Sequence, residues 1–306
     1  MPQDLILRIS QGSLDLLRGA YRGLAEPRVL YLLQYSRHGC AAQCRFCAQA
    51  LGGDRLGRIP WPAVPLTRLL DYGPARVFER ACLQTILKPG YWEEALAILQ
   101  ALGEAGLRLS LAVTPVPGER LAEAKEAGVD HLGVGLDAFS RRVFARARKP
   151  YTWEAYLRFI GEAAAVYGPR NVYVHLIAGL GETPEEVLSL LDTLHRLGVR
   201  AALFPLVSRT RPWNPLVGKS YYRRVQLAVW LLNRGLRPRD YLGPGLQPEP
   251  GLKELPGLEE AFLTQGCPGC NRPFYTERPG DIYNYPSRIL LEEDLGRVLA
   301  EAGLGR

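Results

Sequence analysis

Short runs of aliphatic and β-branched residues alternate along the chain with longer segments in which apolar residues recur at helical spacing. Such alternation is typical of repeated strand–helix units around a parallel sheet. The apolar runs predict six strands, over residues 29–35, 75–83, 107–113, 129–136, 171–177 and 199–207. The helical spacing predicts helices over residues 91–105, 118–127, 152–167, 184–197 and 219–234.

The clearest helix boundary follows the fifth strand. Thr183 is a favourable cap, and Pro184 suits the first helical position because it lacks an N–H that would need a partner there. Glu186 stands three residues after the cap, which completes a capping box. The pattern therefore predicts a helix that begins at Pro184.

These units predict an α/β fold, a partial (β/α)6 TIM-type barrel over residues 29–235 that follows a helical lead-in over residues 1–28. After residue 235, frequent prolines predict a loop-rich extension over residues 236–306, with a short helix over residues 292–302. The extension could instead supply two degenerate units and close an eight-stranded barrel. In either case we expect the chemistry at the C-terminal ends of the strands.

Composition narrows the class of protein. The chain has 306 residues and no long uncharged apolar run, and its N-terminus lacks the order of a signal peptide, so a cytoplasmic protein without a membrane partner is expected. The formal charge of +7 favours acidic partners, and the alternative is a solvated thermostable surface. The basic cluster over residues 141–149 has no interleaved aromatic residues, so nucleic acid is not expected as a partner. A single Met and 24 prolines fit a thermophile protein.

Six cysteines in a cytosolic chain are poor candidates for disulfides, because the compartment keeps thiols reduced. Three of them, Cys40, Cys44 and Cys47, lie soon after the first predicted strand and have the spacing C-x3-C-x2-C. Three thiolates can hold a [4Fe–4S] cluster and leave one iron open. The alternative is a zinc site completed by His38, although zinc motifs usually contain paired C-x2-C units.

This spacing, with Phe46 just before the third cysteine, resembles the radical S-adenosylmethionine (SAM) superfamily. The resemblance implies that SAM binds the open iron, and that an electron from a donor such as ferredoxin then cleaves SAM to a 5′-deoxyadenosyl radical. Phe46 would lie close to the SAM adenine.

The remaining cysteines are Cys82, at the C-terminal end of the second predicted strand, and the pair Cys267 and Cys270 in the extension. We interpret these three as ligands of a second, auxiliary iron–sulfur cluster. For this the tail would fold back over the barrel mouth. The alternatives are a buried structural Cys82 and a zinc knuckle or dithiol formed by the pair.

Residues 30–215 resemble biotin synthase. The segment Arg80-Ala81-Cys82-Leu83-Gln84 is similar to its second strand, where a cysteine holds the sulfur-donating cluster. The segments Leu136-Asp137-Ala138 and Gly179-Leu180-Gly181-Glu182-Thr183 are similar to its later motifs. The resemblance implies that Asp137 binds the SAM ribose and that Gly179 and Gly181 let the backbone approach adenine. The alternatives are a helix cap for Asp137 and an ordinary turn for the glycines.

The tail resembles the split lipoyl synthases, which are pairs of biotin-synthase-like proteins, in its segment Cys267-Pro268-Gly269-Cys270-Asn271-Arg272-Pro273. This resemblance implies sulfur insertion into an octanoyl group on a carrier protein or lipoyl domain, together with a paralogous radical SAM subunit. Arg272 would be a ligand or neighbour of the auxiliary cluster, or else part of a surface salt bridge. His175, on the fifth predicted strand, is expected to be a core histidine, and the alternative is that it faces the cavity.

Two other functions remain open. The chain could be a biotin-synthase-like enzyme that acts on a small molecule, although biotin synthase has no such tail. It could also be a non-catalytic iron–sulfur partner that delivers sulfur or supports its paralogue.

Overall fold

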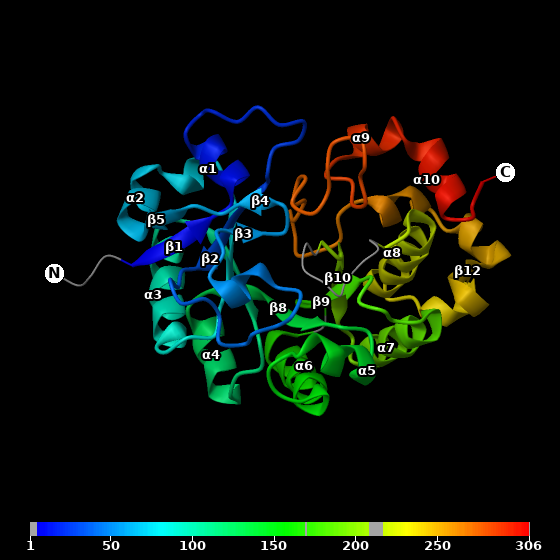
Figure 1. Cartoon of the computed structure of the whole chain (residues 1–306), viewed down its shortest axis with the longest axis horizontal. Helices are drawn as coiled ribbons and strands as arrows, with labels where there is room; N and C mark the ends of the chain where they lie inside the picture. The colour runs from blue at the N-terminus through cyan, green and yellow to red at the C-terminus, as the bar shows by residue number, and fades with distance from the viewer. Residues whose placement is uncertain (1–4, 169, 208–216, 306) are drawn as a thin grey trace.

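Six parallel strands form the centre of the protein (Figure 1). The computed structural model describes residues 5–168, 170–207 and 217–305. The strands lie in the order β10-β9-β8-β7-β6-β2, and each is parallel to its neighbours. Their bounds are β2 Val29–Gln34, β6 Arg80–Gln84, β7 Arg108–Val113, β8 Val129–Asp137, β9 Val172–Ala178 and β10 Arg200–Pro205. The predicted α/β partial barrel is confirmed.

The sequence predicted a helical lead-in over residues 1–28, but the structure shows a strand before the helix there. Its first described element is a strand, β1 (Ile6–Ile9), which pairs antiparallel with β2 and with β5 (Ala63–Pro65). Three of its four residues are buried. Packing against β2 therefore stabilises a strand that is too short to be recognised from its sequence. A small hairpin, β3 (Arg55–Leu56) and β4 (Ile59–Pro60), precedes β5.

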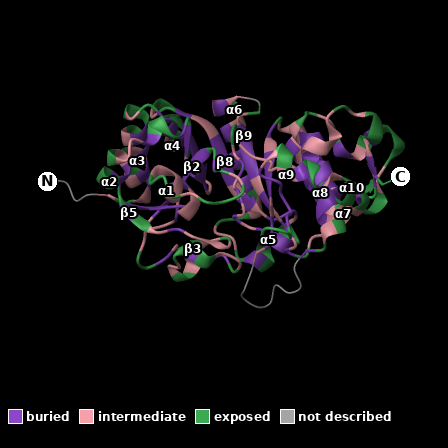
Figure 2. Cartoon of the chain, turned by 90° about the horizontal axis from the view of Figure 1, so that it is seen from above, coloured by how far each residue is buried: buried purple, intermediate pink, exposed green. Residues whose placement is uncertain are grey.

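Helices cover the outer face of the parallel strands (Figure 1). Buried residues concentrate on these strands and on α8 (Figure 2). The predicted capping box at Thr183 is confirmed, because its side chain accepts from Glu186 N and the Glu186 carboxylate accepts from Thr183 N. The helices are α1 Gln11–Leu17, α2 Leu66–Asp71, α3 Tyr91–Glu104, α4 Gly118–Glu126, α5 Arg141–Ala147, α6 Trp153–Tyr167, α7 Pro184–Arg196, α8 Lys219–Asn233, α9 Arg288–Glu292 and α10 Leu295–Glu301.

The second parallel strand, β6, begins later than its apolar run predicted. The preceding segment Pro74–Arg76 is a 3-10 turn introduced by Gly73, whose φ is +63°. Cys82 is consequently the middle residue of β6 and not its C-terminal end. It lies directly beside Tyr31 of β2 and Ser110 of β7, deep in the barrel.

The extension does not add two strands to the sheet. Its described strands, β11 (Leu242–Gly243) and β12 (Gln247–Pro248), pair only with each other. The predicted final helix corresponds to α10, and α9 before it was not predicted. The sheet thus stays open, with β10 and β5 as its edge strands, and the tail connects β10 to β2 on the open side. The Arg272 guanidinium donates to Leu203 O of β10, while Arg272 N donates to the Tyr31 hydroxyl of β2.

Within the described residues, no helix combines the length and the apolar character needed to cross a membrane.

Candidate active site

Cys40, Cys44 and Cys47, the first cysteine site, lie on one loop after the C-terminal end of β2. Gly39 makes the loop possible, because its φ is +80° and a Cβ there would lie 2.7 Å from Gly52 N. Cys40 Sγ accepts from Leu87 N at 3.3 Å, and all three cysteines line one inner cavity of about 320 Å³. The loop thus brings the three predicted ligands to the same space.

Burial governs the ionisation of these thiols. It raises the pKa of Cys44 to about 12 and that of Cys47 to about 11, although Lys149 partly offsets the shift at Cys44. Without a bound cation, both thiols therefore stay protonated near neutral pH. Iron binding would replace the two protons and relieve the cost of burying thiolates. A donor set of three such thiols fits an iron–sulfur cluster.

Asp137 and Lys149 form a buried ion pair in the wall of the inner cavity. Lys149 Nζ lies 2.6 Å from Asp137 Oδ2, and the lysine side chain is only 4% exposed. Burial alone would lower the pKa of Lys149, but Asp137 outweighs it and raises that pKa above its ordinary value. Lys149 Nζ also lies 5.9 Å from the Phe46 ring centroid. Asp137 does not cap the next helix, because Ser140 is the cap of α5.

Gly179 and Gly181 form a tight turn after β9, with φ values of +107° and +101°. A Cβ on Gly179 would lie 3.0 Å from Val217 Cβ, so this glycine allows close packing. Gly179 N donates to Glu182 Oε1 at 2.7 Å. Neither glycine is among the described residues that line the inner cavity. Their contact with adenine stays a prediction.

Cys82, Cys267 and Cys270, the second cysteine site, also line the inner cavity. Burial raises the pKa of Cys82 to about 12, and a negative charge on Cys270 would raise it further. Burial and then the charges of Cys82 and Cys270 likewise raise the pKa of Cys267. Tyr31 connects the two parts of this site, because it pairs in register with Cys82 and its hydroxyl lies 3.6 Å from Cys270 Sγ. The structure brings together the residues that the sequence had placed in one site.

Arg272 belongs to the interior and not to a surface salt bridge. Its guanidinium carbon lies 3.9 Å from the Phe204 ring centroid, and its Nη2 donates to Gln265 O at 2.8 Å. It lines the inner cavity and counteracts the raised pKa of Cys82 and Cys267. This position fits the predicted neighbour of a cluster.

The tail reaches the opposite end of the barrel from the one predicted. Asn271 Oδ1 accepts from Arg28 N at 3.1 Å, and Gly269 packs beside Val29 at the start of β2. The turn over residues 266–270, hereafter the cysteine turn, therefore lies at the N-terminal ends of the strands and forms the floor of the inner cavity. The backbone before β2 supplies the partners there, because Arg28 N donates to the Asn271 side chain and Glu26 O accepts from it.

A second, outer cavity of about 680 Å³ borders the other side of the cysteine turn. Gly266, Cys267, Pro268 and Cys270 line both cavities. Arg28, Arg200 and Arg288 also line the outer cavity, whose described lining contains no carboxylate. The turn therefore separates the inner cavity from an outer cavity that three arginines line.

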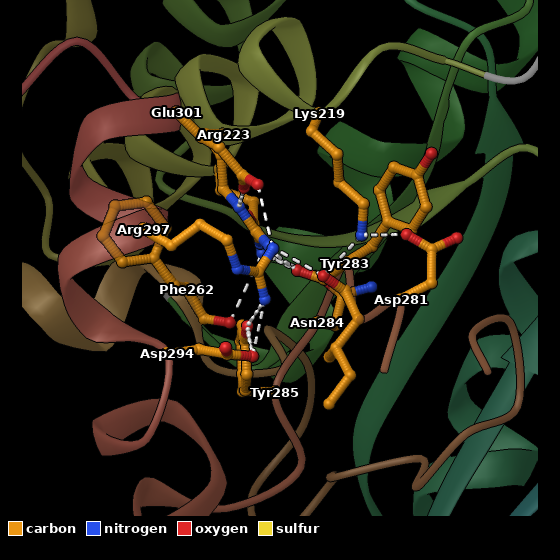
Figure 3. A network of polar contacts seen from close by, with 12 residues as sticks. Lys219, Arg223, Phe262, Asp281, Tyr283, Asn284, Tyr285, Asp294, Arg297 and Glu301 are labelled. Atoms are coloured by element: carbon orange, nitrogen blue, oxygen red, sulfur yellow. Dashed lines mark hydrogen bonds and ion pairs between the residues drawn. The ribbon is translucent and has the colours of Figure 1, made fainter. Parts of the chain in front are cut away.

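Buried polar contacts hold the rest of the tail against α8 (Figure 3). The fully buried Arg223 donates to Glu301 at 2.9 Å and to the carbonyl oxygens of Tyr283 and Ile282. Lys219 donates to Ile282 O at 2.7 Å and lies over the Tyr283 ring. These bonds fix residues 282–284 on the barrel, and with them the chain that follows the cysteine turn.

Lys149, Tyr31 and His175 are among the cavity residues that were not predicted as site residues. His175 was expected in the core, with the cavity as the alternative. It lines the cavity, and Gly133 leaves room for its ring. Burial lowers the pKa of His175 to about 4, so the imidazole is neutral at pH 7. Side chains alternate along a strand, so Tyr173, His175 and Ile177 of β9 point to the same face. This alternation was the signal that could have placed His175 in the cavity.

Within the described ranges, no three His, Cys, Asp or Glu side chains converge on a point that one metal ion could occupy. In a cubane each cysteine binds a different iron, so its thiolates need not converge on one point.

A family model of the Radical SAM superfamily matches residues 36–194, just over half of the chain. The chain belongs to this superfamily. It is therefore a radical SAM enzyme, and its family implies a [4Fe–4S] cluster and SAM as cofactors. The matched region contains the first cysteine site and Asp137, and it ends before the tail.

Comparisons with individual proteins agree with this assignment. Biotin synthase 2 from Paracoccus denitrificans (strain Pd 1222) is 24% identical over 210 residues, which cover 64% of each protein. The chain thus spans less than two thirds of that relative's length, but the similarity makes it biotin-synthase-like.

Two solved structures share the fold. The [FeFe]-hydrogenase maturase HydG has a TM-score of 0.52 at 12% identity, covering 68% of this chain and 50% of its own. Methylornithine synthase (PylB) has a TM-score of 0.51 at 16% identity, and the match covers 68% of this chain and 63% of that protein.

Proposed function

We propose that the chain is a sulfur-inserting radical SAM enzyme and a component of a split lipoyl synthase, which converts a protein-bound octanoyl group towards lipoyl. The observation that carries the proposal is a single cavity with two three-cysteine sites at opposite ends. The chemistry needs two such sites, because one generates the radical and the other supplies sulfur.

Cys40, Cys44 and Cys47 would ligate three irons of the first cluster and leave the fourth to SAM. When bound, that cluster and SAM supply a 5′-deoxyadenosyl radical able to remove hydrogen from an unactivated C–H bond. Asp137 would accept hydrogen bonds from the ribose hydroxyls, and Lys149, held at 2.6 Å, fixes the orientation of its carboxylate. Phe46 would pack near the adenine.

Cys82, Cys267 and Cys270 would hold the second cluster, and one of its sulfides would be the sulfur transferred to the substrate. Arg272 would offset the negative charge of these thiolates. Between the two sites the cavity wall is largely apolar, with Ile86, Val113, Ile177 and Leu206 among its residues. An apolar wall suits an octanoyl chain and excludes water that would quench a radical.

The substrate would arrive on a carrier protein or lipoyl domain. A formal charge of +7 supports attraction to an acidic carrier and to an acidic electron donor such as a ferredoxin. The paralogous subunit would perform the other of the two sulfur insertions.

The decisive experiment combines iron analysis with product analysis. Anaerobically reconstituted protein should contain about eight irons per chain, from two [4Fe–4S] clusters. Incubated with SAM, a reductant, the paralogue and an octanoylated lipoyl domain, it should add sulfur that mass spectrometry detects on the octanoyl group. Two clusters without sulfur addition to any octanoyl carrier would contradict the lipoyl assignment.

The similarity to Biotin synthase 2 favours a second candidate, sulfur insertion into a small molecule. Screening free acids with unactivated C–H bonds in the same assay separates the two substrates. If the isolated chain forms no 5′-deoxyadenosine with a chemical reductant, it is instead a non-catalytic partner.

A further inference from the structure

Tyr31 lies between the two parts of the chain that form the second cysteine site. It is 3% exposed and pairs in register with Cys82 on the neighbouring strand. Side chains at paired positions of adjacent parallel strands point to the same face of the sheet. Tyr31 and Cys82 accordingly both line the inner cavity.

The Tyr31 hydroxyl binds the tail directly after the cysteine turn. It accepts from Asn271 N at 2.9 Å and from Arg272 N at 3.0 Å. One residue of β2 thus pairs with two successive backbone amides that follow Cys270. These bonds connect β2, which lies beside Cys82, to the chain that carries Cys267 and Cys270.

The phenol has one proton left to donate, and two acceptors lie near it. Cys270 Sγ is 3.6 Å away and Asn271 Oδ1 is 3.5 Å away. The Asn271 oxygen already accepts from Arg28 N at 3.1 Å. A cysteine that binds iron is a thiolate, and an ionised acceptor forms the stronger hydrogen bond. The sulfur is therefore the preferred acceptor once Cys270 is a ligand.

We propose that Tyr31 is a positioning residue of the second cysteine site, which anchors the cysteine turn and donates a hydrogen bond to the Cys270 sulfur. This inference rests on the proposed function, because it assumes that Cys82, Cys267 and Cys270 hold a cluster. Hydrogen bonds to cysteine sulfur are among the factors that set the potential of an iron–sulfur cluster. The bond stabilises the more negative reduced state, so its loss makes the cluster harder to reduce.

Tyr275 provides a matched control. It is a buried tyrosine whose ring meets Tyr31 edge-on at 5.0 Å between centroids, but its hydroxyl donates to Ser10 Oγ. Phenylalanine at position 31 or 275 removes one buried hydroxyl from the same aromatic cluster. Only Tyr31→Phe removes the contacts to Cys270 and to the two backbone amides.

The test uses the full chain with Cys40, Cys44 and Cys47 replaced by Ala, so that only the second cluster can form. In this background Tyr31→Phe should lower the midpoint potential measured by an EPR-monitored redox titration, and Tyr275→Phe should leave it unchanged. In the apo-protein, hydrogen exchange at the amides of Asn271 and Arg272 should be about 5- to 30-fold faster in Tyr31→Phe, as expected for the loss of 1–2 kcal/mol. Tyr275→Phe should not change it.

The outcomes separate the two claims. If the background protein binds no iron, the auxiliary cluster and with it the proposed function fail. If it binds a cluster whose potential and apo-protein amide exchange are the same in Tyr31→Phe and Tyr275→Phe, the role of Tyr31 fails while the cluster stands. An equal loss of thermal stability in both variants alone reflects core packing and does not support the inference.

Discussion

The first cysteine site is built from one loop, whereas the second joins the middle of a strand to a tail that returns from the far end of the chain. Cys40, Cys44 and Cys47 lie within eight residues, so their proximity follows from local chain geometry. Cys82 meets Cys267 and Cys270 only because the tail crosses the open side of the barrel. The first site therefore depends on its own loop, and the second on long-range packing.

This difference has a thermodynamic consequence. Closing the long segment between Cys82 and the cysteine turn costs chain entropy that the tail contacts must offset. The contacts of Tyr31, Asn271 and Arg223 are among the described interactions that do so. Changes far from the sulfurs should then weaken the second site and leave the first intact, as the predictions below test in order of decreasing effect.

The largest effect is expected at the first site. Replacing Cys40, Cys44 or Cys47 by Ala should abolish SAM cleavage, because no other thiol on that loop can complete a three-ligand site. Chromatography of 5′-deoxyadenosine after chemical reduction measures the loss. Normal cleavage by any of the three variants would contradict the assignment of this site.

Substitutions at the second site should stop sulfur addition and leave SAM cleavage intact. With Cys267 and Cys270 both replaced by Ala, the protein should keep about four irons and still cleave SAM, but add no sulfur to an octanoyl carrier. Iron analysis, 5′-deoxyadenosine formation and mass spectrometry of the carrier give the three readouts. Unchanged sulfur addition would show that the tail cysteines are structural.

A substitution of Arg223, which holds the tail on α8, should weaken the second site although it lies outside that site. Arg223→Met removes a fully buried guanidinium and leaves Glu301 without that partner, which should cost about 3 kcal/mol of the free energy of unfolding. Iron content should fall from about eight towards about four per chain, while SAM cleavage continues. Urea denaturation and iron analysis measure the two effects.

Arg297 is the matched control for Arg223, because it contacts Glu301 at 3.0 Å but its side chain is 45% exposed (Figure 3). Arg297→Met should cost no more than about 1 kcal/mol and leave both clusters in place. If Arg223→Met loses the first cluster as readily as the second, the sites are not independent and the comparison fails.

The same contrast explains what the sequence could predict. Helices such as α3, α6 and α7 follow local apolar spacing and caps, and their bounds agree with the prediction within a residue or two. The spacing of the first site is local in the same sense. Lys149 was hidden in a basic cluster that resembles a solvated surface, since only its packing beside Asp137 makes it a cavity residue.

Long-range packing also accounts for the errors. The placement of Tyr31 and of the cysteine turn depends on where the tail crosses the barrel, which no local pattern encodes. The tail was expected at the mouth because active-site residues gather there, but its polar groups bind the N-terminal ends of the strands instead. Cys82 was placed at a strand end because the apolar run before β6 continues through a 3-10 turn.

The smallest effect is expected where a contact is local and distant from both sites. Thr183→Ala removes the hydroxyl that accepts from Glu186 N at 3.2 Å, which should cost about 1 kcal/mol of unfolding free energy. Thr183→Ser keeps the hydroxyl and should lose only a few tenths of that amount. No described residue of α7 lines the inner cavity. Iron content and SAM cleavage should therefore equal those of the unmodified protein in both variants. Loss of either cluster in Thr183→Ala would show that the two sites respond to global stability, and so contradict the separation of local from long-range construction.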